Sequence, residues 1–79
     1  MDFDVKIVVA RPSDYQPHWR AKITLIGGPH EFKNARYACS RDAAIRGCQV
    51  AVLRTLAEWL AVGEVPEPLN AVTFNVVDD

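Results

Sequence analysis

One long segment with helical periodicity occupies more than a quarter of this 79-residue chain and limits what the chain can fold into. Ser40 stands where it can cap a helix over residues 41–62, and Gly63 and Pro66 follow where the helix must end. The apolar residues of the segment recur at helical spacing and form one stripe: Ile45, Cys48, Val52, Leu56, Trp59 and Leu60. A helix with one apolar stripe must bury it against another layer, so the rest of the chain has to supply that layer.

The remaining segments carry strand patterns. Strict alternation and β-branched residues predict strands over residues 3–10, 18–26 and 71–77, and a weaker alternation predicts a short strand over residues 31–38. A proline-bounded segment, residues 11–17, reads as a long hairpin loop between the first two strands. We expect one α+β domain over residues 1–79, in which an antiparallel sheet of three to four strands packs on one long helix.

Charge and cysteine content restrict the partners that such a domain can bind and the cellular compartment in which it works. A net charge of −1 and a pI near 6.1 argue against direct nucleic-acid binding, which usually needs a basic excess. Neither a membrane span nor a signal peptide is recognised. Helical rise separates Cys39 from Cys48 by on the order of 13 Å, beyond the ~7 Å that a disulfide bridges. We therefore expect both thiols to be free, and we expect the protein to work in the cytoplasm of a bacterial host cell.

The sequence contains no set of residues with catalytic or metal-binding spacing. Ser40 and His30 could form a nucleophile and base, but Ser40 is better explained as the helix cap. The histidines and cysteines lack the paired close spacing of zinc sites, and no phosphate-binding glycine loop occurs. We predict a protein that is not an enzyme and has no cofactor and no metal.

Basic residues on the predicted strands suggest a binding surface. If the helix covers one face of the sheet, Lys6, Arg20, Lys22 and Arg36 line the other face. This group could steer association with an acidic protein surface or a nucleic-acid backbone. The alternative is a sheet face that is merely solvated by its charged side chains.

Two further segments are candidates for contact with a partner. Tyr15 projects from the proline-bounded loop, and exposed aromatic rings often dominate binding. Ala43, Gly47 and Ala51 lie four residues apart on the predicted outer side of the helix, with Val50 beside them. Small residues permit the close approach of a partner or of a second copy in a homodimer. The alternative is that they are ordinary surface positions, with Gly47 costing about 1 kcal/mol of helix stability.

Parts of the chain resemble the HicB-like antitoxins. The resemblance is carried by the run SRDAAI at residues 40–45, by Trp59 and Leu60, and by the run GEVPEP at residues 63–68. It implies an antiparallel sheet, one helix and a final strand, in a protein that neutralises an RNase toxin.

The layout of the whole chain is similar to that of small phage-encoded type I anti-CRISPR proteins. A proline-containing hairpin over residues 5–25 leads into an alanine-rich helix over residues 43–61, in a small acidic chain. This resemblance implies a non-enzymatic inhibitor that binds a Cas subunit. We therefore expect a protein partner. A Cas subunit is the first candidate, and an RNase toxin is the second.

Overall fold

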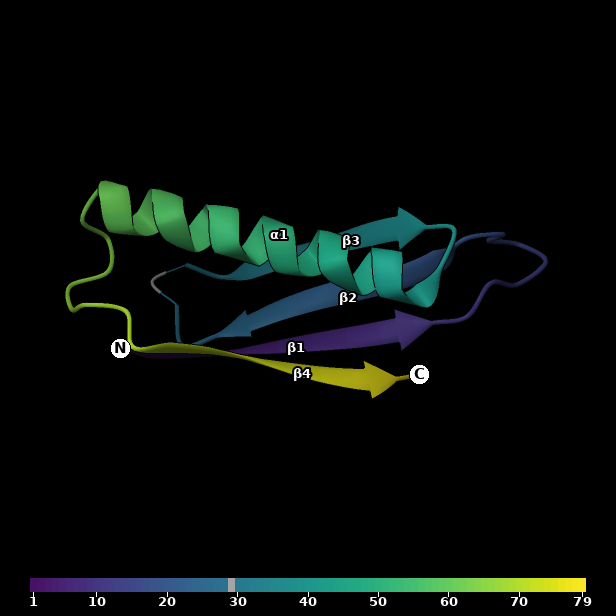
Figure 1. The fold of residues 1–79 in the computed structure, drawn as a ribbon, viewed down its shortest axis with the longest axis horizontal. Helices are drawn as coiled ribbons and strands as arrows, with labels where there is room; N and C mark the ends of the chain where they lie inside the picture. The colour runs from purple at the N-terminus through teal and green to yellow at the C-terminus, as the bar shows by residue number, and fades with distance from the viewer. Residues whose placement is uncertain (29) are drawn as a thin grey trace.

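The computed structural model describes residues 1–28 and 30–79 as a four-stranded sheet with one helix on one of its faces (Figure 1). The strands and the helix follow one another along the chain as β1 (Asp2–Ala10), β2 (Trp19–Ile26), β3 (Phe32–Ala38), α1 (Arg41–Ala61) and β4 (Ala71–Asp78). The predicted α+β class and each predicted element are confirmed, with boundaries that shift by a residue.

The sheet is mixed, with the strand order β3-β2-β1-β4. β1, β2 and β3 are antiparallel neighbours as predicted, but β4 pairs in parallel with β1, so the expectation of a wholly antiparallel sheet was wrong. The helix explains this difference. Its 21 residues span about 31 Å and carry the chain from the end of β3 back to the end where β1 begins, so the next strand runs in the direction of β1 (Figure 1).

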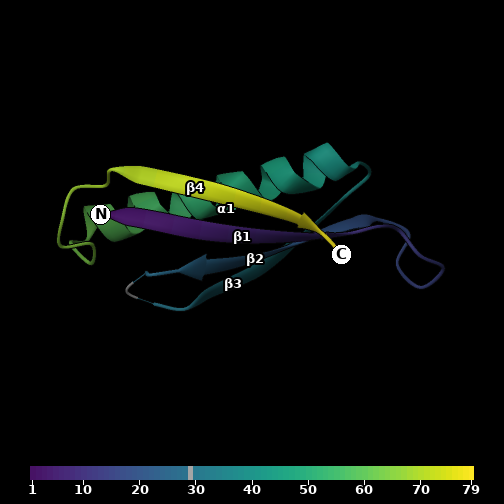
Figure 2. The same cartoon turned by 90° about the horizontal axis from the view of Figure 1, so that it is seen from below.

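The core lies between α1 and the sheet face that it covers (Figure 2). β1 contributes alternate side chains from Phe3 to Val9, and β2 contributes alternate side chains from Ala21 to Leu25. From the helix, the buried side chains are Ala44, Cys48, Ala51, Val52, Leu56 and Trp59. Two members of the predicted stripe lie at its margin, because Ile45 is only half-buried and Leu60 is exposed.

Both ends of α1 have the predicted caps. The Ser40 hydroxyl accepts a hydrogen bond from the Ala43 amide at 3.2 Å, as an N-cap does. Gly63 has a φ of +77°, a left-handed conformation that glycine adopts without strain, and the next amide bonds back to the Trp59 carbonyl at 2.9 Å.

Within the described residues, no helix combines the length and the apolar character needed to cross a membrane. Both cysteines are free, as predicted, with Cys39 exposed and Cys48 buried.

Candidate protein-binding surface

The helix covers one face of the sheet and leaves the opposite face open (Figure 2). The strand register and burial put Lys6, Arg20 and Lys22 on this open face. In the antiparallel register Lys22 faces Val8 and Arg20 faces Ala10, on the side of each strand that points away from the core. All three basic side chains are exposed. The predicted placement of these residues is therefore confirmed: Arg20 and Lys22 lie near the start of β2, and Lys6 lies at the middle of β1.

The β1–β2 loop extends from this same end of the sheet (Figure 1). Ser13 and Gln16 close a four-residue turn through two backbone hydrogen bonds of 2.7 and 3.2 Å. Tyr15 lies at the tip of the turn and is 99% exposed, as expected for a projecting ring. We call Lys6, Arg20 and Lys22, together with the adjoining loop tip at Tyr15, the basic face.

Tyr37 belongs to the basic face as well, and the sequence pattern did not identify it. It lies opposite Arg20 across the β2–β3 pair and is more than half exposed. The alternation in β3 is irregular because polar side chains occupy both of its faces, so the sequence does not show which face Tyr37 occupies.

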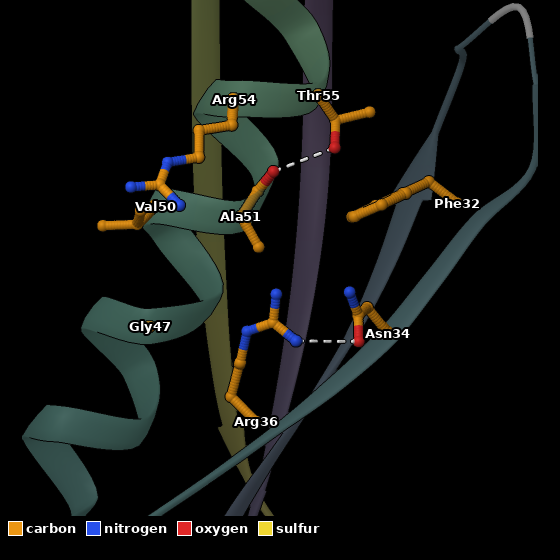
Figure 3. A pocket seen from close by; sticks show the side chains of 8 residues that line it. All are labelled: Phe32, Asn34, Arg36, Gly47, Val50, Ala51, Arg54 and Thr55. Atoms are coloured by element: carbon orange, nitrogen blue, oxygen red, sulfur yellow. Dashed lines mark hydrogen bonds between the residues drawn. The ribbon is translucent and has the colours of Figure 1, made fainter.

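Arg36 lies on the other face of the sheet, so its predicted place on the open face was wrong. In the register of β2 and β3 it faces Ala21, a core residue. Its stem packs toward α1, where a methyl group built on Gly47 would lie 3.5 Å from the Arg36 Cγ. Its guanidinium donates to the Asn34 Oδ1 at 3.1 Å (Figure 3).

The small residues on α1 face β3 rather than an outer surface, which corrects a second expectation. Gly47, Val50 and Ala51 line a groove of about 390 Å³ between α1 and β3, and Ala43 is half-buried outside it. Arg54, which the sequence pattern did not single out, also lines the groove; its side chain points away from β3, whereas Arg36 reaches into the space between the strand and the helix (Figure 3). The lining residues are Phe32, Asn34, Arg36, Gly47, Val50, Ala51, Arg54 and Thr55.

The ion pairs of the described residues include neither Lys6, Arg20 and Lys22 nor the two arginines that line the groove. They join His30 to Glu64 at 2.6 Å, Lys33 to Glu31 at 2.8 Å and Arg41 to Asp78 at 2.9 Å. Hydrogen bonding to Lys33 lowers the pKa of Glu31, and the same contact raises the pKa of Lys33. The basic face and the groove therefore present cations to solvent although the chain as a whole is slightly acidic.

The residues considered for chemistry have structural partners. Ser40 caps the helix, and His30 pairs with Glu64 and packs edge-on to Trp59, with ring centroids 6.0 Å apart. The Cys48 thiol is buried and donates to the Ala21 carbonyl at 3.3 Å, and burial raises its pKa. Across residues 1–28 and 30–79, no three His, Cys, Asp or Glu side chains are grouped to hold a metal ion.

No family model matches the chain, and neither a curated protein nor a solved structure is significantly similar to it. The function therefore has to be inferred from the surfaces described above.

Proposed function

We propose that this chain is a non-enzymatic inhibitor that binds an acidic surface of a larger nucleic-acid-processing protein. The observation that carries the proposal is the placement of Lys6, Arg20 and Lys22 together on the uncovered sheet face. Cations grouped on one face attract an acidic partner, although the net charge of the whole chain is negative.

The basic face also contains aromatic groups that suit a protein partner. Tyr15 exposes a large ring at the tip of the β1–β2 loop, and Tyr37 exposes one opposite Arg20. Tyrosine and arginine are enriched among the residues that carry most of the binding energy in protein interfaces. A face that only needed solvation would not require two exposed aromatic side chains.

The partner that we propose is a subunit of a type I Cas effector, which would make the chain an anti-CRISPR protein of a phage that acts in the cytoplasm of its bacterial host. The second candidate is an RNase toxin neutralised by a HicB-like antitoxin. The observation that favours this second candidate is the order of three strands, one helix and a final strand, which is the layout that this resemblance implies.

The proposal is tested by charge reversal on the basic face. The variant K6E/R20E/K22E should inhibit target-DNA binding by a purified type I Cas complex at least about tenfold less well than the unchanged chain, because complementary charges set association. The control variant R36E/R46E/R54E has the same net charge, with its substitutions at exposed positions outside the basic face. It should inhibit as well as the unchanged chain.

The other outcomes separate the alternatives. Inhibition of a HicB-type RNase toxin, and not of the Cas complex, would select the antitoxin function. A salt-dependent gel shift of DNA or RNA that K6E/R20E/K22E abolishes would show direct nucleic-acid binding and overturn the protein partner. Equal loss of inhibition in both triple variants would overturn the assignment to the basic face.

A further inference from the structure

The two edges of the sheet differ in how they are protected. β3 forms one edge and carries Lys33 and Arg36, while β4 forms the other edge. From Ala71 to Val77 the β4 strand contains no charged residue and no proline. Soluble proteins usually protect a sheet edge with charges, prolines, bulges or a covering element, because its free backbone groups pair with other strands. The β4 edge has none of the sequence features of this protection.

The helix does not compensate for this, because it packs mainly on β2 and β3 at the other side of the sheet. Val76, on the helix side of β4, is therefore left 39% exposed, and Val77, on the open side, is 46% exposed. Leu60 is also exposed, on the flank of α1 that points away from the β3 groove. An uncharged edge strand is thus bordered by uncovered apolar side chains.

We propose that β4 pairs antiparallel with β4 of a second copy of this chain, so that the two four-stranded sheets form one continuous sheet. The two-fold axis of such a pair is perpendicular to the sheet and passes near Phe74. Both helices then lie on the same face of the joined sheet, and both basic faces lie on the opposite face.

The sequence of β4 is complementary to itself in this register. Its register with β1 puts Val72, Phe74, Val76 and Asp78 on the helix side of the sheet. With Phe74 opposite its own copy, Val72 faces Val76 on that side, and Ala71 faces Val77 on the open side. A different register of the two β4 strands, with Asn75 opposite its own copy, would place Val72 of one copy opposite the Asp78 carboxylate of the other. That register would therefore set an apolar side chain against a charge.

The edge of β3 is a poorer partner for β4. Pairing β3 with β4 would be head-to-tail, so it would leave a free edge at each end and continue into a fibre. It would also place the charges of Lys33 and Arg36 beside the apolar residues of β4. The two-fold pairing of β4 removes one edge from each copy and closes the assembly.

Sedimentation of the full chain over a range of concentrations tests the proposal. The unchanged chain should approach twice its mass of 8.8 kDa as its concentration rises. Val76→Lys should remain monomeric, because its ammonium would lie against Val72 of the other copy. Val50→Lys is the matched control, since Val50 is 46% exposed on α1 and lies outside β4; it should dimerise like the unchanged chain.

Val77→Lys, on the open side of the same strand, should also be monomeric and leaves the helix-side packing intact. Circular dichroism establishes that the lysine variants are folded. In a dimer of labelled and unlabelled chains, nuclear Overhauser contacts should join Val72 of one copy to Val76 of the other. A monomer at every concentration, a dimer that persists in both β4 variants, or contacts from another surface would overturn the proposal.

Discussion

Gly47 shows how the environment of one residue changes its interpretation. Its position inside a helix suggested close approach of a partner, but the neighbour that approaches is the aliphatic stem of Arg36. A methyl group at this position would stand 3.5 Å from Arg36 Cγ, which is ordinary van der Waals contact. The groove thus tolerates a slightly larger side chain, and glycine is not required there.

We expect Gly47→Ala to raise the free energy of unfolding by about 1 kcal/mol, because alanine has the higher helix propensity and meets no clash. Urea denaturation measures the change. Gly63→Ala is the control and should lower stability by about 1 kcal/mol, since the left-handed conformation of Gly63 strains any side chain. Destabilisation by Gly47→Ala would mean that Arg36 cannot accommodate the methyl group.

The two thiols should differ sharply in reactivity. Cys39 is exposed, whereas Cys48 is buried and its pKa is raised by burial, so its nucleophilic thiolate is scarce. In the folded protein, a thiol reagent such as iodoacetamide should modify Cys39 and leave Cys48 unmodified until urea unfolds the chain. Mass spectrometry of the digested protein locates the label. Equal modification of both thiols without denaturant would contradict the burial of Cys48.

At the scale of the elements, a contact between distant segments fixes the end of β4. Arg41, the first residue of α1, donates from Nε and Nη2 to the two carboxylate oxygens of Asp78 at 2.9 and 3.0 Å. Asp78 lies on the helix side of β4 because of the parallel register with β1. The contact therefore depends on the direction of β4 that the helix imposes.

This contact should make stability depend on pH. The hydrogen bonds from Arg41 lower the pKa of Asp78 below its ordinary value of 3.8. Their stabilisation is therefore present above that value and is lost as the pH falls through the lower pKa of the folded state. Asp78→Asn should remove this part of the acid dependence, so its urea midpoint should fall less than that of the unchanged chain between about pH 5 and about pH 2. Identical pH profiles would show that the pair does not contribute.

At the scale of the whole molecule, one core holds the sheet and the helix together. Leu56 of α1 and Ile7 of β1 are both fully buried in it. The chain is small enough that a single core must supply most of its stability. Pairing through β4 would enlarge the protected structure and present the two basic faces side by side on the same side of the joined sheet.

Leu56→Ala should therefore lower the free energy of unfolding of the whole domain by about 2 to 5 kcal/mol, because it leaves a cavity in this core. Loss of helix by circular dichroism and loss of tryptophan packing by fluorescence should occur at the same urea concentration. Leu53→Ala, at an exposed position on the same helix, is the control and should change stability little. Separate transitions for the two probes would contradict a single cooperative domain.

The local patterns of the chain were sufficient to predict its elements. Alternation in β1 and β2, the helical spacing from Ile45 to Trp59 and the caps at Ser40 and Gly63 depend on interactions between near neighbours, which a sequence displays directly. The same alternation placed Lys6, Arg20 and Lys22 correctly on the open face. Tyr15 was identified because a turn exposes its tip.

Only the tertiary structure decided the direction of β4, the face on which Arg36 lies and the side of α1 on which Gly47 lies. Each of these depends on how distant segments pair. β3 has polar residues on both faces, so its register with β2 determines that Arg36 meets the helix and that Tyr37 joins the basic face. The unprotected edge likewise exists because β4 pairs with β1 on one side and, in the part of the chain that the structure describes, with no strand on the other.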